Sequence, residues 1–125
     1  MNVRSISAVT LAVNDMERSV EFYGGNIGME LLYGGASASF TSFKVGEGYV
    51  NLTLAATESP TRGRDHRPAS WGRVIFHVED VDALYLRLVQ AGLSPTTEPA
   101  DAPWGERYFH IHDPDSHELS FAKPI

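Results

Sequence analysis

The chain of 125 residues contains one pattern twice, and this repeat limits its possible folds more than any other feature. The segment AVTLAVNDMERSVEFY, residues 8–23, matches RVIFHVEDVDALYLRL, residues 73–88, when Asp15 is aligned with Asp80. Each copy opens with alternating apolar residues, which predicts a strand with one buried face. An acidic turn suited to cap a helix follows, and the predicted helices end near Gly28 and Gly92.

A second match follows each predicted helix. FKVGEGYVNLTL, residues 43–54, and FHIHDPDSHELSF, residues 109–121, both indicate a strand, a tight turn and a strand. Aligning the two turns places Val50 opposite Leu119 and Asn51 opposite Ser120. We therefore predict an α+β fold with two tandem βαβββ modules in one domain, residues 1–125. Module 1 covers about residues 1–56, a polar linker covers 57–70, and module 2 covers about 71–125.

Composition excludes several classes of protein. The absence of cysteine excludes disulfides, thiolate nucleophiles and cysteine-ligated zinc. A net charge of −6 argues against nucleic-acid binding, which needs a basic face. No apolar run approaches the length of a membrane span, and the N-terminus does not have the pattern of a signal peptide. We expect a cytoplasmic protein with no nucleic-acid or membrane partner.

Three segments carry a resemblance to a known family. VNDMERSVEFY with the following Gly28-Met29, HVEDVDALYLRLVQAGL and WGERYFHIHDPDSHELSF together resemble the vicinal oxygen chelate superfamily, also called the glyoxalase, bleomycin resistance and extradiol dioxygenase superfamily. The resemblance covers nearly the whole chain. It implies that the two modules form a curved half-barrel sheet with helices on the convex face. Many members pair as dimers, so a homodimer is expected.

Strand alternation separates core residues from residues that face the cavity. The expected core set is Val9, Leu11, Val13, Val50, Leu52, Leu54, Val74, Phe76, Val78, Phe109, Ile111, Leu119 and Phe121. The expected cavity set is Ala8, Thr10, Ala12, Tyr49, Asn51, Thr53, Arg73, Ile75, His77, Tyr108, His110, His112, Glu118 and Ser120. His117 is out of phase with Glu118 and is expected by the turn, on the opposite face.

Catalytic members of the family bind a divalent metal, and the resemblance implies four ligand positions for it. These are usually His, Gln or Glu, but here they hold Ala8, Asn51, Arg73 and Ser120. Alanine and a guanidinium do not ligate metals, and a cation beside Arg73 would be repelled. We therefore predict no metal and no cofactor. The alternative is a shifted metal site built from His77, His110, His112 and Glu118, which would suit a lyase, isomerase or dioxygenase of the same superfamily.

Without a metal, the predicted cavity offers a cation among aromatic rings, which suits a planar ligand with an oxygen that Arg73 could bind. The predicted function is a metal-independent binding protein, more a binding protein than an enzyme, that sequesters an aromatic or planar molecule in a cleft at a dimer, as drug-resistance proteins do. No catalytic residue is assigned. The predicted ligand-binding residues are Arg73, His77, Tyr49, Asn51, Trp71, Trp104, Tyr108, His110, His112, Glu118 and Ser120.

Structural roles for the same residues remain open. The tryptophans could pack in the core or at a dimer interface, and the histidines could be polar lining residues only. Arg73 could form a salt bridge with Glu118 or Glu106 instead of binding a ligand. A third possibility is a dimeric domain whose cleft is filled by its own side chains and takes no ligand.

Overall fold

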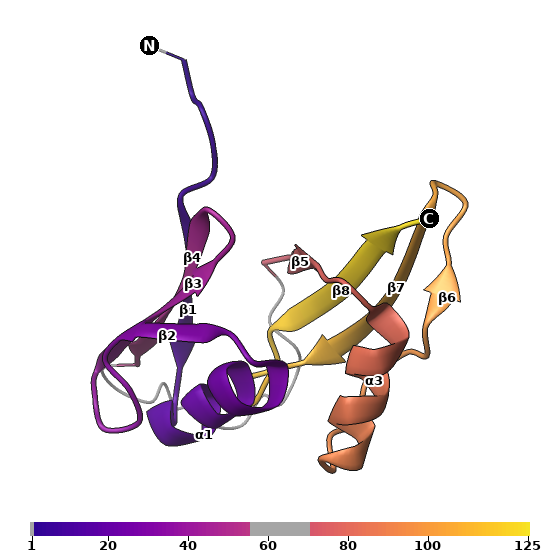
Figure 1. The fold of residues 1–125 in the computed structure, drawn as a ribbon. Coiled ribbons are helices and arrows are strands. Elements are labelled where there is room, and N and C mark those ends of the chain that lie inside the picture. Colours follow the sequence, from indigo (N-terminus) through magenta and orange to yellow (C-terminus); the bar gives the residue numbers. More distant parts are fainter. Residues whose placement is uncertain (1, 56–70) are drawn as a thin grey trace. The chain divides into compact units, whose positions relative to one another are not determined.

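The computed structural model describes residues 2–55 and 71–125, which belong to two compact units, Met1–Arg64 and Asp65–Ile125 (Figure 1). The predicted linker, residues 57–70, lies outside the described residues. The α+β class and the two tandem modules are confirmed. No helix in the described residues is long and apolar enough to cross a membrane.

The first unit is a four-stranded sheet with one helical segment. Its elements are β1 (Ala8–Val13), α1 (Met16–Val20), the π-helical turn η1 (Glu21–Ile27), β2 (Glu30–Tyr33), β3 (Phe40–Val45) and β4 (Gly48–Leu54). The strand order is β1-β4-β3-β2, and β1 runs parallel to β4. The π-helical turn was not predicted. It continues α1 through Gly24 and Gly25, residues with low helix propensity.

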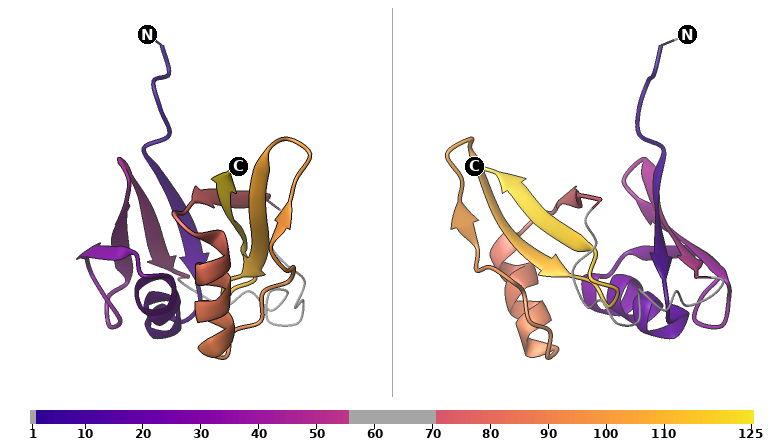
Figure 2. Two further views of the ribbon diagram at one scale, coloured as in Figure 1. Left: turned by 45° about the vertical axis from the view of Figure 1, so that its right-hand side comes forward. Right: turned by 180° about the vertical axis from the view of Figure 1, so that it is seen from behind.

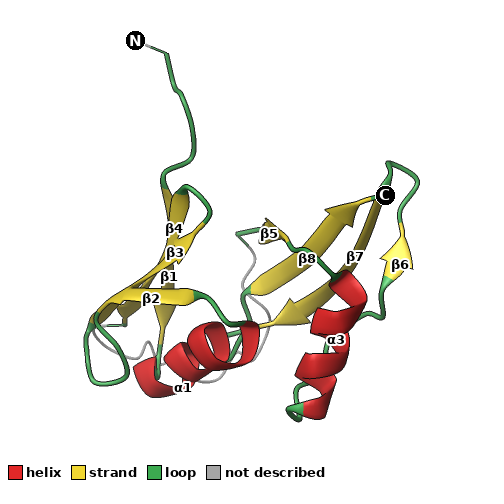
Figure 3. Cartoon of the chain, in the orientation of Figure 1, coloured by secondary structure: helices red, strands yellow, loops and turns green. Residues whose placement is uncertain are grey.

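The second unit repeats this topology. Its elements are β5 (Arg73–His77), α3 (Val81–Gln90), β6 (Ala100–Asp101), β7 (Glu106–His112) and β8 (Glu118–Pro124). The strand order is β5-β8-β7-β6, and β5 runs parallel to β8. Figure 3 shows α3 beside this sheet, and the views of Figure 2 agree that it covers one face. The helix-facing side of the sheet includes Phe109, whose ring contacts Tyr85 of α3 at 5.4 Å between centroids.

Helix caps form as the sequence predicts. The Asp15 carboxylate accepts a hydrogen bond from the backbone N–H of Arg18 at 3.1 Å, and Asp80 accepts one from Ala83 at 3.0 Å. Both aspartates have extended backbone angles, which is the geometry of an N-cap. Gly28 and Gly92 have φ angles of 91° and 89°, so each ends its helix in the left-handed conformation that glycine tolerates.

The predicted core is largely correct. Leu11, Val13, Val50, Leu52, Phe76, Phe109, Ile111, Leu119 and Phe121 are buried, and Val9, Val74 and Val78 are half-buried. The prediction for Leu54 was wrong: its side chain is 39% exposed. Leu54 is the last residue of β4, so alternation gives the direction of its side chain but does not decide how much of it neighbouring elements bury.

Candidate functional site

The register of the second sheet places small side chains between large ones. Ser120 and Ala122 lie on β8, the strand between β5 and β7. Ser120 pairs with Ile75 on one side and His110 on the other, while Ala122 pairs with His77 and Tyr108. Although they lie on the face opposite Phe109 and Phe121, Ser120 is 2% exposed and Ala122 1%. Ser120 and Ala122 therefore form a floor, and the larger side chains of β5 and β7 stand on either side of it.

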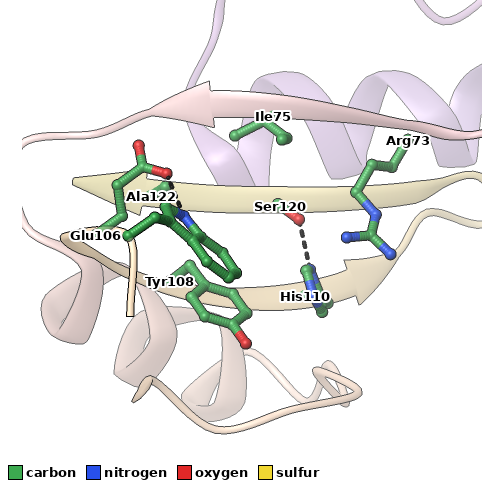
Figure 4. Close-up of a pocket in the computed structure, with 8 residues that line it drawn as sticks. Arg73, Ile75, Glu106, Tyr108, His110, Ser120 and Ala122 are labelled. Carbon is green, nitrogen blue, oxygen red and sulfur yellow. Dashed lines mark hydrogen bonds between the residues drawn. The ribbon is translucent and has the colours of Figure 1, made fainter. Parts of the chain in front are cut away.

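A pocket of about 110 Å³ lies over this floor. We call it the sheet pocket; it is lined by Arg73, Ile75, Trp104, Glu106, Tyr108, His110, Ser120 and Ala122 (Figure 4). An apolar cavity of 150 Å³ can hold a benzene molecule, so the sheet pocket has the size of a single ring. It is smaller than the roughly 300 to 1,000 Å³ of pockets that enclose drug-sized ligands.

One wall of the sheet pocket is aromatic. Tyr108 and His110 are two residues apart on β7, so they share a face, and their rings are 5.0 Å apart between centroids. The Trp104 ring stacks on Tyr108 at 5.9 Å with 25° between the planes. Its indole Nε1–H donates to Glu106 Oε1 at 3.0 Å, which fixes the ring although it is 69% exposed. The wall is thus preorganised for stacking against a flat ligand.

Charged side chains lie at both ends of the floor. At one end Arg73 Nε forms an ion pair with Glu118, its register partner on β8, and His112 Nε2 lies 3.8 Å from the other Glu118 oxygen. At the other end His77 Nε2 and Glu106 Oε2 are 2.8 Å apart, so this contact joins β5 to β7 across Ala122. The salt-bridge alternative for Arg73 is therefore correct for Glu118, while Glu106 pairs with His77.

His110 is held from below by Ser120. Its Nδ1 is hydrogen-bonded to the Ser120 hydroxyl, and its backbone N–H donates to Thr97 Oγ1 at 2.9 Å. Burial lowers the pKa of His110 below its ordinary value, and the positive charge of Arg73 lowers it further. Glu118 acts in the opposite direction. The neutral imidazole is therefore favoured at pH 7.

The structure brings together only part of the predicted ligand-binding set. Five predicted residues line the sheet pocket: Arg73, Trp104, Tyr108, His110 and Ser120. His77 and Glu118 lie beside it as partners of Glu106 and Arg73, and His112 lies next to Glu118. Ala122 was missed, although it lies two residues after Ser120 on the same strand and therefore on the same face.

Trp71 is oriented differently from the prediction. Its Nε1–H donates to Nδ1 of the buried His117 at 3.1 Å, and Trp71 is not among the lining residues of the sheet pocket. His117 lies next to the β7–β8 turn, where the Asp113 carboxylate accepts hydrogen bonds from the backbone of Asp115 and His117. Trp71 thus ties the start of β5 to this turn.

Tyr49 and Asn51 lie on β4 of the first unit. Asn51 Nδ2 donates to Thr10 Oγ1 at 3.3 Å, and Lys44 Nζ lies 4.7 Å from the centroid of the Tyr49 ring. Tyr49 is 37% exposed, so its ring is open to solvent within this unit. The role of these two residues in a ligand site stays a prediction.

The donor set does not fit a divalent metal. In residues 2–55 and 71–125, no group of three or more His, Asp or Glu side chains is placed to hold one. Within the alternative site, His77 is bound to Glu106, Glu118 to Arg73, and His110 Nδ1 to Ser120. The guanidinium of Arg73 also adds a positive charge at this end of the pocket, which opposes a cation.

Fold and site together define a class: a chain of two tandem βαβββ modules with a ring-sized pocket on the open face of the second sheet. A family model described as the Glyoxalase/Bleomycin resistance protein/Dioxygenase superfamily matches residues 5–121. The chain therefore belongs to this superfamily.

Solved structures share the fold at low sequence identity. A Bacillus anthracis protein assigned to the glyoxalase family is 20% identical with a TM-score of 0.79, covering 100% of this chain and 98% of its own. Lactoylglutathione lyase from Agrobacterium tumefaciens is 18% identical with a TM-score of 0.75, covering 98% and 96%. A genomically encoded fosfomycin resistance protein from Listeria monocytogenes is 16% identical with a TM-score of 0.75, covering 99% and 96%. At these identities the likeness shows the fold alone.

Proposed function

We propose that this protein is a metal-independent binding protein for a small aromatic or planar molecule. The observation that carries the proposal is the sheet pocket itself, in which one guanidinium, an aromatic wall and a floor of small side chains surround a ring-sized space. Flat rings gain both buried area and stacking geometry in such a space. Sequestration of such a ring-sized aromatic or planar molecule, by analogy with drug resistance proteins, is the biological role that we infer.

The identity of residue 73 supports a function without a metal. Arg73 stands where the family resemblance places a ligand, and its Nε is paired with Glu118. A guanidinium has no lone pair to offer and stays protonated in proteins. No step through a metal is therefore derived for this site.

We also propose that the protein acts as a cytoplasmic homodimer. Within its own unit the sheet pocket is shallow, with Ile75 57% exposed and Trp104 69% exposed. A ring bound there keeps one face in water unless a second surface covers it, and a second copy of the chain would supply such a surface. Light scattering coupled to size-exclusion chromatography should give twice the mass of the chain, and a monomer would contradict this part of the proposal.

Two measurements test the binding function. The purified protein is incubated separately with manganese, iron, cobalt, nickel and zinc salts, dialysed, and analysed for metal content. We expect substoichiometric metal in every case. A panel of planar aromatic compounds is then screened by thermal denaturation, where binding raises the midpoint by mass action. One tightly held metal per chain with metal-dependent turnover would replace the proposal by a lyase, isomerase or dioxygenase.

A further inference from the structure

The burial of Ser120 beside His110 indicates which nitrogen of the His110 ring carries the proton. Ser120 is 2% exposed, so its hydroxyl hydrogen needs an acceptor inside the protein. Among the described residues that acceptor is His110 Nδ1. An imidazole that accepts at Nδ1 and is neutral carries its hydrogen on Nε2. Since His110 lines the sheet pocket, Nε2–H is a hydrogen-bond donor for whatever occupies that pocket.

Arg73 supplies further donors at the same end. Glu118 pairs with Nε, and within the described part of the chain no hydrogen bond from a terminal nitrogen of Arg73 to another residue is present. Figure 4 shows the guanidinium of Arg73 turned toward the His110 ring, on the pocket side of the sheet. The four N–H groups on these two nitrogens can therefore bind a ligand while the ion pair with Glu118 stays intact.

At the opposite end of the sheet pocket, the N–H groups of Trp104 and His77 already bind Glu106, and the Tyr108 hydroxyl is the remaining donor. Both Glu106 oxygens already accept a hydrogen bond, Oε1 from Trp104 and Oε2 from His77. Apart from the Tyr108 hydroxyl, the donors available to a ligand thus gather at the Arg73 end, and the aromatic wall runs from there toward Trp104.

We infer that the sheet pocket selects planar ligands that present an anionic oxygen, an aromatic carboxylate or phenolate, to a donor pair formed by Arg73 and His110. The ring then lies over Ser120 and Ala122 and against Tyr108. This inference rests on the proposed binding function and adds the chemical class and the orientation of the ligand. It assigns His110 as a donor, positioned by Ser120, rather than as a base or a metal ligand.

The test compares ring-sized probes that differ in one group. Benzoate, 4-nitrophenolate, benzamide, toluene and benzylamine are each titrated into the full chain at pH 7.5 and followed by ¹H–¹⁵N NMR. The indole N–H of Trp104 and the amides of β7 report binding at this pocket. A charge-assisted hydrogen bond contributes about 1.5 kcal/mol or more, so benzoate and 4-nitrophenolate should bind about tenfold more tightly than toluene or benzylamine. Benzamide should lie between them.

Substitutions then show which residues cause the preference for anionic probes. Arg73→Gln should remove the preference for the two anions while toluene binding stays the same, and His110→Leu should reduce it. Arg87→Gln is the matched control, since it removes the same charge from the exposed surface of α3, outside the pocket lining. A long-range ¹H–¹⁵N spectrum of the histidine rings should show His110 protonated on Nε2.

Each outcome of these titrations either supports or overturns the inference. The anion preference and its loss in Arg73→Gln support it. If all five probes shift Trp104 with similar affinity, the aromatic binding function stands and the anion inference is overturned. A preference for benzylamine, or a His110 proton on Nδ1, also overturns it. If no probe shifts Trp104 or β7, the proposed binding function fails and the inference fails with it.

Discussion

The ion pair between Arg73 and Glu118 offers a direct test of whether Arg73 serves the fold or the site. Both side chains are partly in water, 47% exposed for Arg73 and 27% for Glu118. The perturbation is a double-mutant cycle with Arg73→Gln, Glu118→Gln and the double variant. The coupling free energy from this cycle measures the pair without the separate effects of each substitution.

The expected coupling is small. Two unit charges about 4 Å apart attract by about 1 kcal/mol in water and by about 4 kcal/mol at the effective dielectric of a protein surface. Desolvation and the ordering of two side chains offset most of this, and exposed pairs typically give about 0.2 to 1 kcal/mol. The coupling should lie near the upper end, about 1 kcal/mol, because Glu118 is the less exposed partner and also has His112 at 3.8 Å.

Urea denaturation of the four proteins at 50 mM and 500 mM NaCl measures this coupling. We expect about 1 kcal/mol at low salt and a smaller value at high salt, because salt screens partly exposed charges. A coupling above about 2.5 kcal/mol that salt does not change would refute the reasoning. Arg73 would then be a structural residue of the β5–β8 pair, and its terminal nitrogens would not argue for a ligand.

Three further predictions concern stability. Asp15→Ala and Asp80→Ala should each lower the free energy of unfolding by about 1 kcal/mol through loss of an N-cap, whereas Asn at either position should retain most of it; equal stability of the Ala and wild-type proteins in urea would contradict this. Phe121→Ala should cost about 3 to 5 kcal/mol in the same assay, since its ring is 1% exposed and lies 5.5 Å from both Phe76 and Phe109. Because the native pKa of His110 is lowered from 6.5, the unfolded chain binds more protons at acidic pH, so stability should fall as the pH drops below about 6.5; this loss should be smaller in His110→Gln, and an identical pH profile would contradict it.

The fold could be predicted because the repeat fixes both pattern and register. Aligning the two turns placed Val50 opposite Leu119 without reference to strand pairing. The structure pairs Val9 with Val50 and Val74 with Leu119, so both modules have the same parallel register. A shift of one residue would move the whole apolar set of a strand to the wrong face, which is why an alternating sequence specifies register so strongly.

Side-chain direction beyond the strands could not be predicted in the same way. Trp71 precedes β5, where alternation gives no direction, and its indole bonds to His117 instead of lining the sheet pocket. The contact between His77 and Glu106 joins β5 to β7 across β8, so it depends on long side chains reaching over a small residue. Ala122 has no functional group that would mark it as a site residue in the sequence. It forms part of the pocket floor only because its neighbours on both strands have large side chains.

The two modules show how one repeat position can acquire new chemistry. At matching places in the register, the first module pairs Ala8 with Tyr49, and the second pairs Arg73 with Glu118. The parallel register is shared, so the difference at this position lies in the side chains: the second module carries a cation whose Nε is paired with its neighbour Glu118. Beside it, in our proposal, the Ser120 hydroxyl donates to His110 Nδ1, which leaves Nε2–H as a donor for a ligand. A position that a relative could use for a metal ligand thereby becomes, in our proposal, a site for an anionic oxygen, and this exchange needs no change in the fold.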